Sequence, residues 1–193
     1  MTDRSHRDAA LVERYLAGDH AAFDELMRAH QERVFGVCLR MLRDRDAALD
    51  AAQETFITVF RKADRFSGRS AFSTWLYRVA VNTCYDALRR QRRHQAEPLP
   101  ETNDPADHQA VDPFDSAELR PDVEAALMAI PEEFRAAVVL SDLEGLSLQM
   151  VAEALDVPVG TVKSRVFRGR KLLAERLGNL GGPSDPHTGE HHA

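Results

Sequence analysis

The chain has 193 residues, of which 44% are hydrophobic and 29% charged, with a formal net charge of −6. This composition is that of a globular protein, long enough for one large domain or two small ones. No apolar run has the length of a membrane span and the N-terminus lacks the apolar core of a signal peptide, so we expect no membrane insertion and a cytoplasmic protein.

Charge is distributed unevenly along the chain. Residues 1–94 carry 17 basic and 13 acidic side chains, whereas residues 95–122 carry one basic side chain, eight acidic ones and five prolines. Such an acidic, proline-rich segment cannot bury enough apolar surface to offset the entropy of ordering it. The sequence therefore predicts two small domains, 1–94 and 121–178, a disordered acidic linker, 95–120, and a disordered tail, 179–193.

Residues 1–94 have the apolar periodicity of helices and no strand-like alternation. The apolar stripe of one long helix comprises Phe23, Leu26, Met27, His30, Val34, Val37, Cys38 and Met41. The next helix begins near Asp46. Its inward side is expected to comprise Ala48, Ala52, Phe56, Val59 and Phe60. After a glycine- and serine-containing loop, a last helix runs from about Ala71, with inward side chains expected at Phe72, Trp75, Leu76 and Val79. The first domain is therefore predicted to be all-helical.

Residues 147–173 have the pattern of a helix-turn-helix. Ser147 can cap a short helix, and Asp156 stands where the turn needs a left-handed backbone, which Asp tolerates better than most residues. Pro158 and Gly160 stop the first helix. In the second helix the inward side is expected to comprise Val162, Val166, Gly169, Leu173 and Leu177. The second domain, from Pro121 onward, is thus also predicted to be all-helical.

The second helix of this pair carries a concentration of positive charge in an acidic protein. Residues 161–177 hold six basic side chains and one acidic one. A helix of this kind can enter the DNA major groove, where its first turns meet base edges and its flanking cations meet phosphates. We weigh this against a solvated charged helix end and favour DNA contact. The candidate DNA-binding residues are Thr161, Lys163, Ser164, Arg165, Phe167, Arg168 and Lys171.

Two further outward rows lie in the first domain. One row, on the helix from Asp46, places an apolar Ile among carboxylates. This pattern fits either a docking face for another helix or an ordinary solvated face. The row comprises Asp50, Gln53, Glu54, Ile57 and Arg61. The other, on the last helix of this domain, combines an amide suited to base edges with arginines suited to phosphates, and includes Arg78, Asn82, Arg89 and Arg90.

The same residues carry a family resemblance. The segments "DAALDAAQETFITVFRKADRFSGRSAFSTWLYRVAVNTCYDALRRQRR" and "LEGLSLQMVAEALDVPVGTVKSRVFRGRKLL" resemble, in this order, the core- and minus-ten-binding region and the upstream-element-binding region of bacterial RNA polymerase sigma factors. The absence of a third helical domain between them resembles the extracytoplasmic-function branch. The chain departs from the family pattern at Gln149, Met150 and Asp156, all outside the base-reading face.

The resemblance implies partners and roles. It implies that the Asp50–Arg61 row docks on the clamp helices of RNA polymerase core, that the second domain meets the flap, and that the basic helix reads the minus-35 element of promoter DNA. It also implies that the loop Asp64–Ser73 captures a base of the minus-ten element, with Arg65, Ser67 and Arg69 beside the arginine row. An anti-sigma factor is a further implied partner, since the free chain is expected to expose both DNA-reading surfaces on a flexible hinge.

Other chemistry is weakly supported. We find no nucleophile, acid–base pair, phosphate loop or metal cluster, so neither an enzyme nor a cofactor is expected. Cys38 and Cys84 fit buried apolar side chains, and the histidines of the tail fit incidental metal affinity. Two alternatives remain: a transcription regulator, which would need a ligand or receiver domain with strands, and a helical nuclease, which would use the carboxylates between Asp44 and Glu54 with a metal.

Overall fold

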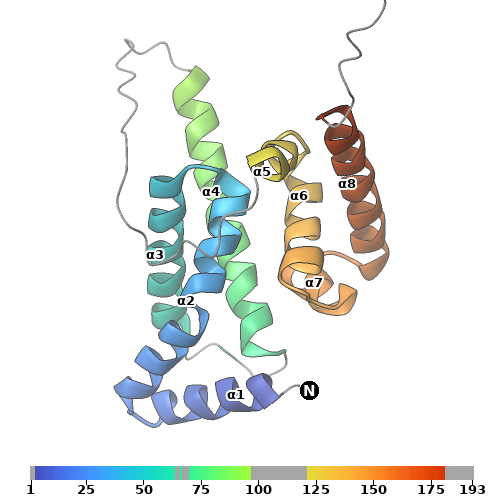
Figure 1. Ribbon diagram of the computed structural model, residues 1–193. Coiled ribbons are helices and arrows are strands. Elements are labelled where there is room, and N and C mark those ends of the chain that lie inside the picture. Colours follow the sequence, from blue (N-terminus) through green and yellow to red (C-terminus); the bar gives the residue numbers. More distant parts are fainter. Residues whose placement is uncertain (1–2, 64–65, 67–69, 97–120, 181–193) are drawn as a thin grey trace, which may run out of the picture.

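The computed structural model describes residues 3–63, 66, 70–96 and 121–180, and within this part the chain is helical and without strands. The predicted all-α fold is confirmed. The elements are α1 (Asp3–Leu16), α2 (His20–Leu42), α3 (Arg45–Lys62), α4 (Phe72–Ala96), α5 (Pro121–Met128), α6 (Glu132–Val138), the π-helical turn η3 (Val139–Leu143), α7 (Leu148–Leu155) and α8 (Val159–Leu180). Figure 1 shows α1 across one end of α2–α4, with α5–α8 beside α4.

Short polar side chains determine where several helices begin. Asp19 accepts a hydrogen bond from the backbone N–H of Ala21, and Asp44 accepts one from that of Ala47, at the starts of α2 and α3. Between these two helices Arg43 adopts a left-handed conformation with φ of 56°, which ends α2 and lets α3 turn back beside it. The first domain is thereby a bundle in which α2 packs on α1, α3 and α4.

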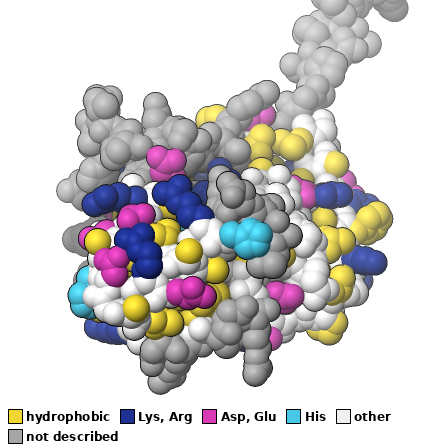
Figure 2. Space-filling model, turned by 90° about the horizontal axis from the view of Figure 1, so that it is seen from below, with side chains coloured by type: hydrophobic (Ala, Val, Ile, Leu, Met, Phe, Trp, Pro, Cys, Tyr) yellow, Lys and Arg dark blue, Asp and Glu magenta, His cyan; other side chains and the backbone are white. Residues whose placement is uncertain are grey.

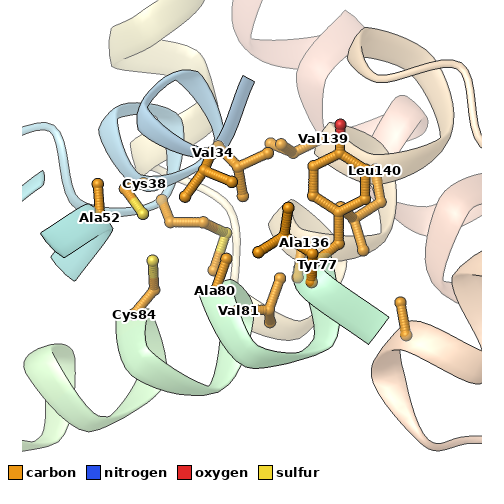
Figure 3. Close-up of a cluster of buried hydrophobic side chains, with 14 of the residues drawn as sticks. Val34, Cys38, Ala52, Tyr77, Ala80, Val81, Cys84, Ala136, Val139 and Leu140 are labelled. Carbon is orange, nitrogen blue, oxygen red and sulfur yellow. The ribbon is translucent and has the colours of Figure 1, made fainter. Parts of the chain in front are cut away.

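The bundle buries most of the side chains that the periodicity assigns to its core. The stripe on α2 is confirmed, since Phe23, Leu26, His30, Val34, Val37, Cys38 and Met41 are buried and Met27 is half-buried. On α3 the prediction is wrong for Phe60, whose exposed fraction is 49%. Cys38 and Cys84 are buried and their sulfur atoms face each other between α2 and α4 (Figure 3). Contact with Cys84 and burial together raise the pKa of the Cys38 thiol.

A buried polar pair fixes α1 on the bundle. Nε2 of His30 lies 3.0 Å from Oδ2 of Asp8, and both side chains are almost completely buried. The His30 ring also packs on Phe72 at the start of α4, with ring centroids 5.6 Å apart. Because a buried polar group must find a partner, this pair specifies where α1 lies relative to α2 and α4.

The second domain contains the predicted helix-turn-helix. Ser147 caps α7 by accepting from the N–H of Met150 at 3.2 Å, and Asp156 adopts the expected left-handed conformation with φ of 55°. α8 begins at Val159, so Gly160 lies inside its first turn. Val151, Val162 and Val166 form the buried contact between α7, α8 and the rest of the domain. The predicted turn chemistry therefore produces the observed geometry.

The two domains share one hydrophobic core. α4 of the first domain packs on α7, and α2 packs on α5, α6 and η3. Figure 3 shows Ala136, Val139 and Leu140 of the second domain beside side chains from α2 and α4. This contact differs from the expectation that both DNA-reading surfaces are freely exposed. The predicted linker lies, apart from residues 95–96, outside the described residues, as does all but the start of the predicted tail.

No helix in the described ranges has both the length and the hydropathy that a membrane span requires.

Gly169 gives a direct test of how α8 packs on α6. A Cβ atom at this position would lie 2.6 Å from Cγ2 of Val138 and 3.2 Å from the Phe134 carbonyl oxygen, a backbone atom that cannot move aside. Gly169→Ala should therefore lower the free energy of unfolding by about 1–3 kcal/mol, measured by urea denaturation. The matched control is Gly178→Ala on the same helix, where nothing lies within 4 Å of the added methyl group. Equal stabilities for the two variants would contradict the close approach.

Candidate polymerase and DNA interfaces

The exposed side of α8 carries the predicted DNA-binding side chains. Lys163, Ser164, Phe167, Arg168 and Lys171 are exposed, and Phe167 has the largest exposed fraction, 71%, among the bulky apolar residues that the structure describes. Figure 2, a view from below, shows Lys and Arg side chains interleaved with hydrophobic ones at the edge that carries α8. An exposed aromatic ring between cations suits a base edge or a thymine methyl group flanked by phosphates.

Two members of the set differ in exposure from the rest. Thr161 and Arg165 are half-buried, and the Thr161 carbonyl accepts a hydrogen bond of 2.9 Å from Oγ of Ser164. Arg165 lies on the side of α8 that faces the first domain, close enough to Tyr85 of α4 to affect its ionisation: burial raises the pKa of Tyr85 to about 12, and the Arg165 guanidinium opposes this shift. In this arrangement Arg165 is therefore less accessible to DNA than its neighbours.

Arg170, on the same helix, is held by an ion pair. Its Nε and Nη2 atoms donate to the two carboxylate oxygens of Asp142 at 2.9 and 2.7 Å. Oγ of Ser141 also donates to Asp142, at 2.7 Å. These hydrogen bonds, that from Arg170 above all, hold the pKa of the Asp142 carboxyl below its usual value. The bidentate pair connects the middle of α8 to the π-helical turn η3 and so fixes the orientation of α8.

The predicted row on α4 is exposed, but most of its cations have acidic partners. Arg78 donates to Asp156 at 2.9 Å, Arg90 donates to Glu54 at 3.2 Å, and Arg89 pairs with Asp86 one turn earlier on the helix. Asn82 is exposed between them. Exposed pairs of this kind are weak, so phosphates can compete for the arginines. The loop residues Arg65, Ser67 and Arg69 lie outside the described residues.

An aromatic cluster lies at the start of α4. Phe66, Phe72 and Trp75 contact one another, with ring centroids between 5.5 and 5.8 Å apart. Trp75 is half-buried and packs on the core, as the spacing predicts. The cluster therefore packs Phe66 against the start of α4 and engages Trp75 in ring contacts rather than leaving it as a free stacking platform.

The outward row of α3 borders an apolar groove between α2 and α3. Asp50, Gln53, Glu54, Ile57 and Arg61 are all exposed. The groove has a volume of about 740 Å³, and its lining includes Phe23, Met27, Phe35, Leu49, Phe56, Ile57 and Phe60. The exposed fractions of Ile57 and Phe60 are both 49%, high for side chains of this size. An open groove with this many aromatic walls is suited to binding the apolar side of a helix.

Sequence reasoning assigned four of the residues that line this groove, Phe23, Met27, Phe56 and Phe60, to the core. Phe23 and Phe56 do contribute to the core, yet they also line the groove beside Phe60. The signal that was missed is the spacing on α3: Phe60 follows the outward Ile57 by three residues, so the two side chains lie on neighbouring parts of one helix face.

The carboxylates between Asp44 and Glu54 do not form a metal centre. Throughout the part of the chain that the structure describes, no three His, Cys, Asp or Glu side chains are grouped so as to hold a metal ion. Asp44 caps α3 and Glu54 accepts from Arg90, so two of these groups have structural partners.

Comparison with known proteins gives concordant matches. The Sigma-70 region 2 family matches residues 26–94, and the Sigma-70, region 4 family matches residues 120–173. The RNA polymerase sigma-H factor of Pseudomonas aeruginosa is 37% identical over 181 residues, covering 89% of this chain and 94% of the relative. The ECF RNA polymerase sigma-E factor of Haemophilus influenzae is 40% identical over 180 residues, covering 88% and 95%.

A solved structure shares the fold. The sigma factor RpoE, crystallised with the anti-sigma factor NepR from Bartonella quintana, superposes with a TM-score of 0.64 at 24% identity, covering 81% of this chain and 96% of that one.

The Asp142–Arg170 pair predicts a pH-dependent contribution to stability. Because the folded pKa of Asp142 is depressed, the contribution is complete above the unfolded value of about 3.9 and is lost as the pH falls through the folded value. Asp142→Asn should thus lower the free energy of unfolding by about 0.5–1 kcal/mol at pH 7. The difference from the parent should shrink progressively as the pH is lowered below about 3.9, in urea titrations at pH 7 and at a series of acidic pH values. Asp24→Asn, at an exposed position of α2, is the control, and a difference that stays undiminished across the acidic series would contradict the pairing.

Proposed function

The chain belongs to the extracytoplasmic-function sigma factors of the sigma-70 family and acts in promoter recognition, and on this premise we propose which of its surfaces meets each partner. The groove between α2 and α3, with the exposed row of α3, docks on the clamp helices of RNA polymerase core. The second domain meets the flap. The exposed side of α8 reads the minus-35 element, and the α4 row with the preceding loop holds the minus-ten element.

The observation that carries the docking proposal is the exposure of Ile57 and Phe60 on an aromatic-lined groove. Burying these two side chains against a partner would remove a large apolar area from water. The rim is charged on both sides, with Asp50 and Glu54 toward the start of α3 and Arg61 toward its end. This polarity favours one orientation of the docked helix, with its basic side chains beside Asp50 and Glu54.

The assignment of α8 rests on the exposed cations and Phe167, and that of α4 rests on Asn82 among arginines. Asn has a donor and an acceptor that match base edges, and the arginines match phosphates. The chain supplies no active site of its own, because polymerase core carries out nucleotide addition. Its place of action is the cytoplasm, where core and promoter DNA are found. An anti-sigma factor is a further partner, supported by the complex of the sigma factor RpoE, which shares this fold, with the anti-sigma factor NepR.

Ile57→Glu tests the docking surface. The substitution places a charge on the groove without disturbing the core, because Ile57 is half exposed. It should weaken binding to polymerase core by at least about tenfold, the effect of burying one unpaired charge at an interface. Ala174→Glu, an exposed position on α8, is the control. Binding is measured with purified core, and the parent protein should also convert core into a promoter-specific initiator in reconstituted transcription. Failure of this conversion would overturn the function itself.

Arg168→Ala tests the reader helix. Arg168 is exposed in the first half of α8, so its loss should cost about 1–3 kcal/mol of holoenzyme binding and relax the preference for the upstream element. Arg176→Ala, two turns farther along, should weaken binding to all sequences evenly, if at all. The measurement is holoenzyme binding across a panel of promoter variants. Identical sequence profiles for the parent and Arg168→Ala would show that this residue does not read bases.

A further inference from the structure

The second domain occupies one side of α4, next to the proposed DNA-binding row. Along this side Tyr77 hydrogen-bonds to Glu144, Tyr85 lies near Arg165, and Arg92 donates to Glu132 at 2.5 Å. These three positions are eight and seven residues apart, which is one face of a helix. The second domain therefore covers a continuous strip of α4 and reaches from its first turns almost to its end.

Glu144 is the centre of this contact. Its Oε1 accepts from Nη1 of Arg40 on α2 at 3.1 Å, and its Oε2 accepts from the Tyr77 hydroxyl on α4 at 2.9 Å. The exposed fractions of the Glu144 and Arg40 side chains are 6% and 14%. Burial and the neighbouring carboxylate raise the pKa of Tyr77 well above its ordinary value, so the hydroxyl keeps its proton and donates. We call these three side chains the Glu144 latch.

The backbone of α2 makes room for the latch. A Cβ atom at Gly36 would lie 2.8 Å from Nη1 of Arg40, the atom that donates to Glu144. Glycine in the middle of a helix is unfavourable, yet here it lets the Arg40 side chain fold back over the preceding turn. A second buried contact supports the first: Nη1 of Arg135 on α6 donates to the Met41 carbonyl at the end of α2, at 2.5 Å.

The closed arrangement engages both sets of proposed DNA-reading residues. Arg78 of α4 pairs with Asp156 in the turn before α8, and Arg165 of α8 lies near Tyr85 of α4. Two promoter elements separated by about two turns of DNA are roughly 70 Å apart. Domains that touch through side chains 2.9 Å apart cannot both reach elements so far from each other. The arrangement held by the latch is therefore incompatible with reading a whole promoter.

We propose that the strip of α4 beside the proposed minus-ten residues (Arg78, Asn82, Arg89 and Arg90) binds one of two alternative partners, promoter DNA or the chain's own helix-turn-helix domain. In the free chain the Glu144 latch holds the helix-turn-helix domain on this strip without any other protein. The competition with promoter DNA rests on the proposed function, whereas the contact between the domains does not. The chain opens when polymerase core and DNA together favour the separated domains, because each ligand shifts the equilibrium by its preference for the open state.

The latch is tested on the purified free chain by single-molecule energy transfer. Dyes are attached to cysteines introduced at the exposed positions Glu32 of α2 and Glu175 of α8, while the buried native thiols remain unlabelled. Tyr77→Phe and Glu144→Gln should each raise the open, low-transfer fraction about tenfold, since each leaves a buried partner without its hydrogen bond. The matched control is Glu153→Gln on α7, whose exposed side chain accepts a hydrogen bond from Gln149 of its own helix.

A second measurement links opening to DNA. The probe is a 60-bp duplex (about 200 Å long) enriched from a randomised pool by the reconstituted holoenzyme. The free latch variants should bind it about tenfold more tightly than the parent and Glu153→Gln. An unchanged open fraction in folded Tyr77→Phe, which loses only one hydroxyl, overturns the latch. An increased open fraction with unchanged DNA affinity overturns the competition with DNA. If no duplex can be enriched, the proposed function fails, and energy transfer still decides on the latch.

Discussion

Three charged side chains, those of Glu144, Arg40 and Arg135, are largely removed from water where the domains meet, and the rest of the arrangement depends on how they are hydrogen-bonded. A carboxylate or guanidinium removed from water is strongly unfavourable unless hydrogen bonds replace its hydration. Glu144 accepts hydrogen bonds from a guanidinium and a hydroxyl group that lie on two different helices of the first domain. Arg135 has no carboxylate among its hydrogen-bond acceptors; it donates to the carbonyls of Met41, Met128 and Ile130, and burial lowers the pKa of its guanidinium. These hydrogen bonds form in only one relative position of the domains. Apolar packing alone would leave that position loosely defined.

The same domain contact affects the proposed polymerase-docking and DNA-reading surfaces differently. The groove is lined by residues of α2 and α3, whereas the strip that the second domain covers lies on α4, so docking at this groove does not itself require the domains to separate. The proposed DNA-reading set on α4, in contrast, contributes Arg78 to the domain contact, where it donates to Asp156. Docking on core and reading of DNA therefore respond differently to the same conformational equilibrium. The contacts between the domains already contribute part of the free energy that favours the closed state. An inhibitor that stabilises this state therefore needs to contribute only the remainder.

Much of the fold could be predicted from the sequence, because its signals are local. The three- and four-residue spacing locates the α2 stripe, and Ser147 and Asp156 define the turn of the helix-turn-helix through their own backbone. The long-range pairs could not be predicted in this way. Nothing near Glu144 in the sequence points to Arg40 or Tyr77, and Asp8 gives no sign that His30 will be its partner. Phe60 was misplaced because an aromatic residue at helical spacing fits a core and a binding groove equally well.

The π-helical turn η3 has a consequence for how this region can change. The N–H of Glu144 bonds to the Val139 carbonyl five residues back, which inserts one residue more per turn than an α-helix holds. This single irregularity directs Asp142 toward α8 and Glu144 toward the first domain. Deleting one residue here would restore regular winding and rotate both carboxylates by about 100°. The orientation of α8 and the contact between the domains are thus coupled through η3, and an insertion or deletion in this turn that alters one alters the other.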